Sequence, residues 1–365
     1  MAEPTSPRTP PPRIIAWEIT RSCNLNCAHC RAAAERGPYP GELDTEQCFA
    51  LVEEIAALGG FLLIITGGEP LLRADALEIA ARATDRGLRV VMAPNGTLVT
   101  PEIAVKMRQA GIQRISISLD FPNAEQHDAF RGVPGAFEGA LRGIEAARQA
   151  GIEVQINTTV TKRNVAYLGQ LVALTQRLGA VAMHPFFLVP TGRGAEMADE
   201  ELAPEEYEQA LRWVYDKQQE LGDRLFFKPT DVPHYWRVRL QCARAEGRPI
   251  EPMHGKAGAG LNVLSRGCLA GTGFCFISHV GKVQPCGYLE LEAGDLKRQS
   301  FGEIWQNSPL FRNLRDLSKL EGKCGECEFK TVCGGCRARA FAATGNYLAE
   351  EPYCVYEPQR LRQRM

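Results

Sequence analysis

The chain lacks the features of a membrane or nucleic-acid-binding protein. None of its 365 residues falls in an apolar run of about eighteen residues, the length needed to cross a bilayer. Its 42 Lys and Arg nearly balance its 43 Asp and Glu, giving a formal net charge of −1, so no polyanionic partner is indicated. The proline-rich stretch Met1 to Arg13 lacks the apolar core of a signal peptide. We therefore expect a cytoplasmic protein with no nucleic-acid partner and no membrane insertion.

Cysteine, by contrast, is abundant, with 13 residues. In a chain without a secretion signal, cysteines indicate metal ligation in a reducing compartment rather than disulfides. Most of them gather in two groups, one near each end of the chain. Of the two outside these groups, Cys48 fits an apolar helix as a small buried side chain, whereas Cys242 has no evident role. A hydrophobic content of 45% is enough for one large or two moderate domains.

The first group is the run Cys23-Asn24-Leu25-Asn26-Cys27-Ala28-His29-Cys30, which offers three thiolates on one short loop. A four-iron cluster normally takes four thiolate ligands, so three would leave one iron open to a small molecule. Zinc also favours closely spaced cysteines, and a zinc site is the alternative for this loop taken alone.

A second motif, Gly67-Gly68-Glu69-Pro70, follows a predicted strand at Phe61 to Thr66. Glycines allow the backbone to approach a ligand closely. A carboxylate at the end of a strand can accept a hydrogen bond from an ammonium group.

Hydrophobic periodicity predicts six strands that alternate with helices. The predicted strands are Ile14 to Ile19, Phe61 to Thr66, Arg89 to Ala93, Arg114 to Leu119, Glu153 to Val160 and Ala180 to Val189. The predicted helices are Asp44 to Leu58, Ala74 to Arg86, Pro101 to Ala110, Ala136 to Ala150 and Val165 to Leu178. Asp44 with Gln47 predicts a capping box. Repeated βα units predict an α/β fold with a parallel sheet, whose ligands bind at the carboxyl ends of the strands.

Together, the cysteine loop and the Gly-Gly-Glu-Pro turn resemble the CxxxCxxC and GGEP motifs of the radical S-adenosylmethionine (SAM) family. The resemblance implies a partial (β/α)6 barrel, similar to a TIM barrel, with one catalytic [4Fe–4S] cluster on Cys23, Cys27 and Cys30. SAM would bind the open iron, and Gly67, Gly68, Glu69 and Pro70 would hold its amino group. Further SAM contacts are expected at or near the strand ends, from Asn95, Ser118, Arg131, Asn157 and Val189.

The second group resembles the SPASM extension of that family, a small Cys-rich domain that binds auxiliary [4Fe–4S] clusters. By analogy, a first cluster would take Cys268, Cys275, Cys286 and Cys336, and a second Cys324, Cys327, Cys333 and Cys354. Cys333 and Cys336 are one residue closer than the usual pattern, so the ligand assignment is open. One or two auxiliary clusters are expected, and a zinc ribbon is the alternative.

These motifs predict five segments: a disordered leader (1–12), the radical SAM partial barrel (13–222), a bridging segment (223–265), the SPASM domain (266–358) and a tail (359–365).

Several further stretches, such as Arg13 to Glu18 and Gln284 to Tyr288, resemble the haem-biosynthetic branch of the radical SAM family. This resemblance implies oxidative decarboxylation of two propionates of Fe-coproporphyrin III to vinyl groups, giving haem b. A reductant such as flavodoxin or ferredoxin would supply electrons. Candidates for contact with the tetrapyrrole are Arg31, His184, Arg193, His234, Tyr235 and Arg237. The alternatives are a related sirohaem-derived tetrapyrrole, a peptide or protein maturase, and a non-catalytic metal-binding protein.

Overall fold

The computed structural model describes residues 9–59, 62–249 and 267–363. The predicted leader therefore lies largely outside the described residues, as do residues 250–265 of the predicted bridging segment. No helix in the described ranges is both long and apolar enough to cross a membrane.

One ten-stranded sheet runs through the described part of the chain, in the order β10-β9-β8-β1-β2-β3-β4-β5-β6-β7. Neighbouring strands from β8 through β1 to β7 are parallel, and β8, β9 and β10 pair antiparallel. The strands are Ile14–Glu18 (β1), Leu62–Thr66 (β2), Arg89–Met92 (β3), Arg114–Ser118 (β4), Glu153–Val160 (β5), Ala182–Phe187 (β6), Phe226–Phe227 (β7), Phe274–Ile277 (β8), Lys282–Gln284 (β9) and Gly294–Asp295 (β10).

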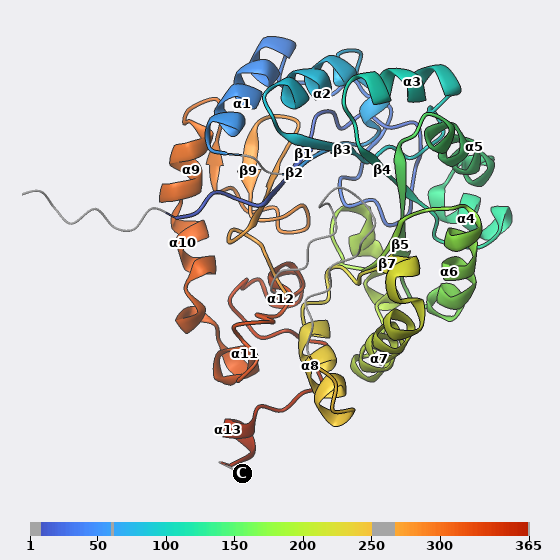
Figure 1. Cartoon of the computed structure of the whole chain (residues 1–365). Coiled ribbons are helices and arrows are strands. Elements are labelled where there is room, and N and C mark those ends of the chain that lie inside the picture. The colour runs from blue at the N-terminus through green and yellow to red at the C-terminus, as the bar shows by residue number, and fades with distance from the viewer. Residues whose placement is uncertain (1–8, 60–61, 250–266, 364–365) are drawn as a thin grey trace, which may run out of the picture.

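Helices follow the strands of the barrel and cover its outer side (Figure 1). They are Thr45–Ala57 (α1), Ala76–Asp85 (α2), Pro101–Gln109 (α3), Ala124–Arg131 (α4), Ala136–Gln149 (α5), Leu168–Arg177 (α6), Pro204–Leu221 (α7) and Tyr235–Ala245 (α8). The C-terminal helices are Phe301–Asn307 (α9), Pro309–Arg315 (α10), Gly322–Glu326 (α11), Arg337–Thr344 (α12) and Gln359–Arg362 (α13). Five 3₁₀ segments join them, at Pro70–Leu72 (η1), Val165–Tyr167 (η2), Gly192–Glu200 (η3), Gly222–Arg224 (η4) and Leu317–Lys319 (η5).

The predicted α/β fold with a parallel sheet is confirmed, and all six predicted strands are present, with ends that differ by at most two residues. Phe61, the predicted start of the second strand, lies outside the described residues. The capping box at the start of α1 is also present, since Gln47 N–H donates to Asp44 Oδ1 at 2.8 Å and Asp44 N–H donates to Gln47 Oε1 at 3.0 Å. The predicted helix at Val165 to Leu178 begins as the 3₁₀ turn η2 before α6.

The sheet has one face toward the helices and one concave face. Met183 on β6 packs toward α6, where Thr175 Oγ1 lies 3.5 Å from its sulfur. Because successive side chains of a strand alternate between faces, His184 and Phe186 lie on the concave face. The apolar core fills the space between the outer face and the helices, whereas the concave face of β4, β5 and β6 carries mostly polar side chains beside Phe186.

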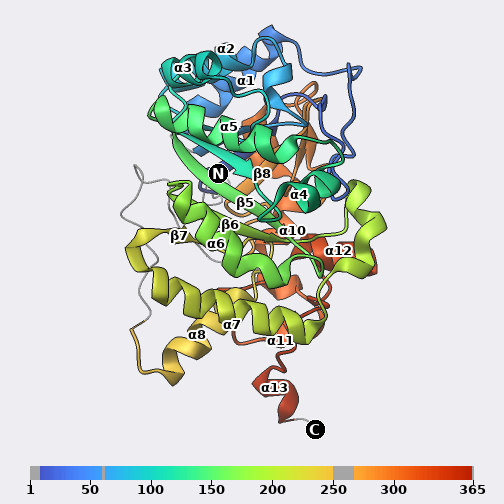
Figure 2. The ribbon, with the colours of Figure 1, turned by 90° about the vertical axis from the view of Figure 1, so that its right-hand side faces the viewer.

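The Cys-rich segment is built onto the barrel sheet rather than appended to it. Strand β8 pairs in parallel with β1, in the register Ile14 with Phe274 through Trp17 with Ile277. Helices α9 and α10 lie next to this end of the sheet, and α7 and α8 lie at the other end (Figures 1 and 2). The described part of the predicted bridging segment contains β7 and the eleven-residue helix α8.

Candidate active site

The first three cysteines lie on the loop after β1, at the carboxyl ends of the strands. Cys23, Cys27 and Cys30 pack into one small apolar cluster with neighbours that include Leu25 and Ala34. The end of α4 holds the loop, because Asn26 N–H and Ala28 N–H donate to the carbonyls of Arg131 and Phe130. Arg193 holds its other side, with Nε donating to the Cys27 carbonyl at 2.9 Å. Arg193 was a candidate for substrate contact, and the structure places its guanidinium on this loop instead.

Two backbone amides point at sulfur atoms of the loop. Leu25 N–H donates to Cys23 Sγ and Ala34 N–H to Cys30 Sγ, each at 3.4 Å. Burial raises the pKa of Cys23 to about 11 and also raises that of Cys27, although the Arg131 charge opposes the shift at Cys27. Buried thiols of this kind become thiolates when a positive metal centre binds them. This donor set fits an iron–sulfur cluster, whose sulfur atoms accept such hydrogen bonds.

Arg131 is engaged by protein groups. Its Nη1 lies 3.6 Å from Cys27 Sγ, and its Nε and Nη2 contact Asp120 Oδ2 at 2.7 and 2.6 Å. Although burial raises the pKa of Asp120, the Arg131 charge and further partners hold it below its usual value. The guanidinium of Arg131, a predicted SAM contact, therefore already pairs with a buried carboxylate and a cysteine sulfur.

The Gly-Gly-Glu-Pro turn packs directly against the start of the cysteine loop. A Cβ on Gly67 would lie 2.6 Å from the Thr20 carbonyl oxygen, and one on Gly68 would lie 2.4 Å from the Arg21 carbonyl oxygen. Pro70 begins η1, and the carboxylate of Glu69 accepts hydrogen bonds from Leu71 N–H at 3.0 Å and Asn95 N–H at 2.6 Å. Complete burial raises the pKa of Glu69 to about 7, because these two bonds offset only part of the desolvation.

A polar network, which the sequence did not predict, joins the cysteine loop to the end of β3. Asn24 accepts from Asn95 Nδ2 at 2.7 Å and donates through its own Nδ2 to Thr97 Oγ1 at 2.8 Å. Asn95, a predicted SAM contact, thus binds both the cysteine loop and Glu69. The two sequence motifs and the strand end form one connected site.

Glu18, at the end of β1, is a buried anion that the sequence reasoning missed. Its carboxylate contacts Arg21 and Arg31 at 2.9 Å and His279 Nδ1 at 2.8 Å. Burial raises the pKa of Glu18, but Arg31, His279 and Arg21 outweigh it and bring the pKa to about 2. Arg31, a candidate substrate contact, also stacks over Phe276 of β8 at 4.2 Å. The order of residues along the chain gives no signal for this pairing.

Three predicted contacts are neighbours across the concave face. Ser118 of β4 pairs in register with Asn157 of β5, which pairs with His184 of β6. His184 lies 3.1 Å from Gln155 Nε2 through Nδ1, and its Nε2 is buried without a partner. Burial and the nearby charges of Lys228 and Arg114 lower the pKa of His184 well below its ordinary value, so the ring is neutral at pH 7. Lys228, just after β7, is a basic neighbour that the sequence reasoning did not name.

Four cysteines of the second group line one cavity: Cys324, Cys327, Cys333 and Cys354. Glu351 N–H donates to Cys324 Sγ at 3.3 Å, and Gly335 N–H donates to Cys333 Sγ at 3.4 Å. His234 and Arg237 line this cavity too, so neither lies with His184 on the concave face. Tyr235, the remaining candidate contact, is buried, and its hydroxyl donates to the side chain of Gln218.

Cys333 and Cys336 belong to different surroundings despite their short spacing. Gly334 and Gly335 between them have φ values of +76° and +62°, the left-handed region that glycine tolerates. Beyond this turn, Cys336 packs with Val189, Leu289 and Cys286. The turn of two glycines therefore separates the two thiols, although only two residues lie between them. Val189, a predicted SAM contact, lies beside Cys336.

Cys275 does not join Cys286 and Cys336. It is fully buried on β8 and belongs to the main apolar core between sheet and helices. The structure therefore does not bring together the four cysteines predicted for the first auxiliary cluster. No three His, Cys, Asp or Glu side chains of the described residues are grouped around a single-ion site.

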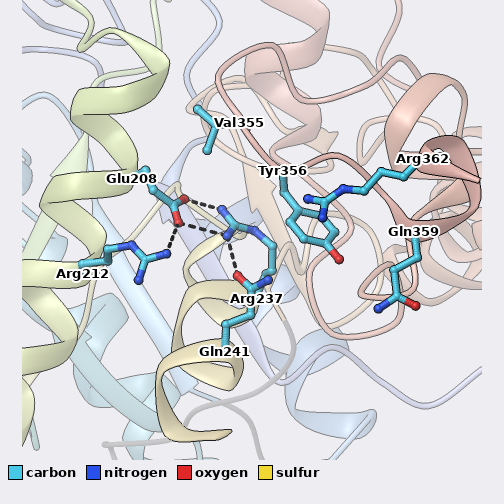
Figure 3. A pocket seen from close by; sticks show the side chains of 8 residues that line it. All are labelled: Glu208, Arg212, Arg237, Gln241, Val355, Tyr356, Gln359 and Arg362. Carbon is cyan, nitrogen blue, oxygen red and sulfur yellow. Dashed lines mark hydrogen bonds and ion pairs between the residues drawn. The ribbon is translucent and has the colours of Figure 1, made fainter. Parts of the chain in front are cut away.

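An open pocket of about 500 Å³ (Figure 3) lies beside the cavity that the cysteines of the second group line. Arg212 and Arg237 both point at Glu208, with Arg212 Nη2 3.1 Å from its carboxylate. Arg237 and Arg362 also lie over the Tyr356 ring, at 5.2 and 5.4 Å from its centre. Arg237, a candidate for contact with the tetrapyrrole, thus already pairs with a protein carboxylate, that of Glu208.

Comparison with known proteins agrees with this site. Residues 17–173 match the model of the radical SAM superfamily, and residues 268–328 match the SPASM model, an iron–sulfur cluster-binding domain. An AdoMet-dependent heme synthase of Methanosarcina barkeri is 54% identical over 95% of this chain and 97% of its own. The chain belongs to the radical SAM superfamily. A second AdoMet-dependent heme synthase, of Oleidesulfovibrio alaskensis, is 51% identical over 96% of this chain and 89% of its own.

Among solved structures, Streptococcus suis SuiB bound to S-adenosylmethionine matches with a TM-score of 0.73 at 14% identity, over 95% of this chain and 78% of that one. At that identity the likeness concerns the fold alone.

This radical SAM enzyme binds SAM and [4Fe–4S] clusters. The cysteine loop fits a cluster, because two backbone N–H groups donate to its sulfur atoms. The close-packed Gly67-Gly68 turn fits the binding of SAM.

Proposed function

We propose that this radical SAM enzyme oxidatively decarboxylates two propionates of Fe-coproporphyrin III to vinyl groups, yielding haem b. The observation that carries the proposal is the identity of 51–54% to AdoMet-dependent heme synthases over nearly the whole length of both chains. Each propionic acid group would lose CO₂, its carboxyl proton, one hydrogen atom from its β-carbon and one electron. When bound and reduced, the catalytic cluster and SAM supply the 5′-deoxyadenosyl radical that takes this hydrogen atom.

The chain's own residues would have separate roles in this reaction. Cys23, Cys27 and Cys30 would hold the catalytic cluster, and the turn at Gly67 to Pro70 would hold SAM, with Asn95, Ser118 and Asn157 nearby. On the concave face, His184 Nε2 is a buried polar atom without a protein partner, with Lys228 close by. A substrate carboxylate beside Lys228 would gain a charge-assisted hydrogen bond.

Under this proposal, the second group of cysteines would hold a cluster that takes part in electron transfer. Each decarboxylation releases an electron, and a cluster held by Cys324, Cys327, Cys333 and Cys354 would accept it. Flavodoxin or ferredoxin would supply the reducing electron at the catalytic cluster. These electron routes are part of the proposal.

The test is an anaerobic assay of the reconstituted full chain with SAM, dithionite and Fe-coproporphyrin III, following 5′-deoxyadenosine and porphyrin masses together. We expect stepwise loss of CO₂ and two hydrogens at each of two propionates, coupled to deoxyadenosine formation. A Cys27→Ala variant is the control and should form neither product. Deoxyadenosine without any change in the porphyrin would overturn the substrate and redirect the search to another sirohaem-derived tetrapyrrole or a peptide.

A further inference from the structure

The two faces of the barrel sheet separate Cys275 from the other cysteines near it. Phe276 of β8 lies on the concave face, where Arg31 stacks on its ring. Because side chains alternate along a strand, Cys275 and Ile277 point to the opposite face, and both are part of the apolar core there. Cys275 pairs in register with Ile15, which is also in that core. Its sulfur thus faces the helix layer.

Cys286 lies on the other side of the sheet. A Cβ on the next residue, Gly287, would lie 3.2 Å from Arg31 Nε and 3.3 Å from the ring of Phe276, both on the concave face. Cys286 packs there with Cys336. Cys268 lies beside the turn that leads to Cys336, since its N–H donates to the Cys333 carbonyl at 3.0 Å. Cys268, Cys286 and Cys336 are therefore the three cysteines of this region, and a four-iron cluster on them would need a fourth ligand.

Asp231 is positioned to supply that ligand. It follows β7, next to the end of β6, where Phe187 N–H donates to the Thr230 carbonyl at 3.2 Å. Arg339 connects it to the cysteines: its Nη1 donates to the Asp231 carbonyl at 2.9 Å, and its backbone N–H donates to Cys336 Sγ at 3.5 Å.

Two features of Asp231 point to a ligand. Its Oδ2 is buried and has no hydrogen-bond partner, and a buried carboxylate oxygen without a partner costs free energy. Its φ is +64°, in the left-handed region, which only one other non-glycine residue of the described chain, Ala33, adopts. Such strain persists where the surroundings impose it, and it recurs at ligand-binding positions.

We propose that the Asp231 carboxylate is the fourth ligand of the auxiliary [4Fe–4S] cluster held by Cys268, Cys286 and Cys336, and that Cys275 is not a ligand. The inference rests on the presence of a first auxiliary cluster, which belongs to the proposed function, but not on the identity of the substrate. A carboxylate is a harder ligand than a thiolate, so this iron would be bound less strongly than the other three.

The test compares two single variants of the full chain, Asp231→Ala and Cys275→Ala, after anaerobic reconstitution. Both are made in a background in which Cys23, Cys27 and Cys30 are alanine, so that only auxiliary clusters contribute. We expect Asp231→Ala to lose roughly one iron per chain and to show the EPR signal of an oxidised three-iron cluster. Cys275→Ala should retain the iron content and spectrum of the parent.

Two further variants keep the proposal falsifiable if Asp231→Ala folds poorly. Asp231→Cys should retain four irons at this site, with a lower reduction potential and an altered EPR spectrum, as expected for a thiolate in place of a carboxylate. Cys286→Ala reports on the cluster itself and should remove it. Parent-like iron and EPR in both Asp231 variants would overturn the assignment of Asp231, and unchanged iron in Cys286→Ala would overturn the first auxiliary cluster as well. Neither result depends on the porphyrin assay.

Discussion

Arg131 Nη1 lies 3.6 Å from the sulfur of Cys27, so a residue at the end of α4 reaches the middle cysteine of the first loop. The same guanidinium neutralises Asp120, which is fully buried. It therefore links the predicted catalytic cluster to the strand end at β4. Its removal would leave one buried charge without a partner and one sulfur without a donor.

We predict that Arg131→Met lowers the free energy of unfolding by about 3–5 kcal/mol, the usual cost of leaving a buried charge unpaired. The double variant Asp120→Asn/Arg131→Met removes both charges and should recover much of that loss. Anaerobic urea unfolding followed by circular dichroism measures both. If the double variant were as unstable as the single one, the buried pair would not be the cause.

The buried ion pairs of Glu18 should make the stability of the fold depend on pH in the acid range. Its folded pKa of about 2 lies below the ordinary value of 4.5, so its ion pairs stabilise the fold above pH 4.5, and this stability is lost as the pH falls toward 2. The shift corresponds to roughly 3 kcal/mol. Glu18→Gln should therefore destabilise the protein by about that amount at pH 7, and the difference from the parent should shrink below pH 4.5.

The control for Glu18 is Glu53, which also pairs with two arginines, Arg82 and Arg86, but is exposed at the surface. Exposed pairs contribute little, so Glu53→Gln should leave the stability and its pH profile nearly unchanged. Equal effects of the two substitutions in unfolding experiments across this pH range would refute the special role of burial at Glu18.

Glu69→Gln tests the turn that we propose holds SAM. The two carboxylate oxygens accept one N–H each, from Leu71 and Asn95, and an amide can accept only one of them. One buried donor would lose its partner at a cost of about 1–3 kcal/mol. We expect SAM affinity, measured by equilibrium dialysis on the reconstituted protein, to fall by roughly tenfold or more, with the iron content unchanged. An unchanged affinity would contradict this role for the turn.

A substitution of Lys228 tests whether the substrate binds at the concave face of the sheet. Under the proposed function, Lys228→Met should raise the KM for Fe-coproporphyrin III several-fold, while SAM cleavage without porphyrin stays close to the parent. Lys162→Met, which removes an exposed lysine bound to the Asp199 carbonyl, is the matched control. A parent-like KM in Lys228→Met would place the propionates elsewhere.

The strands and the cysteine loop could be predicted because their signals are local. Short apolar runs that alternate with helical segments predict the six strand positions, and the Asp44–Gln47 pair predicts the start of α1. The Gly-Gly-Glu-Pro turn and the cysteines are both contiguous motifs. Each of these features depends on residues within a few positions of one another.

The partners of individual side chains could not be predicted in the same way. The face that Cys275 occupies depends on the pairing of β8 with β1, which joins segments far apart in the chain. The pairing of Glu18 with His279, and of Arg131 with Asp120, likewise arises only when the sheet closes. The resemblance to the SPASM extension assigned Cys275 to a cluster, whereas the structure places its side chain in the main apolar core.

The last prediction uses two glycines with similar backbones. Gly132 and Gly135 have φ values of +70° and +82°, so alanine at either position costs about 1–2 kcal/mol in backbone strain. Their surroundings differ: a Cβ at Gly132 would lie 2.3 Å from the Asn26 carbonyl oxygen, whereas at Gly135 it would meet nothing within 4 Å. Only Gly132→Ala must displace the loop between Cys23 and Cys27.

Both variants should therefore lose a similar amount of stability from strain, but only Gly132→Ala should also lose iron and SAM cleavage activity. Iron analysis and deoxyadenosine formation after identical reconstitution measure the difference. If Gly135→Ala lost iron equally, backbone strain alone would account for the effect. A selective loss in Gly132→Ala would instead mean that the end of α4 positions the cysteine loop, because the two substitutions differ chiefly in the atom that the new methyl group meets.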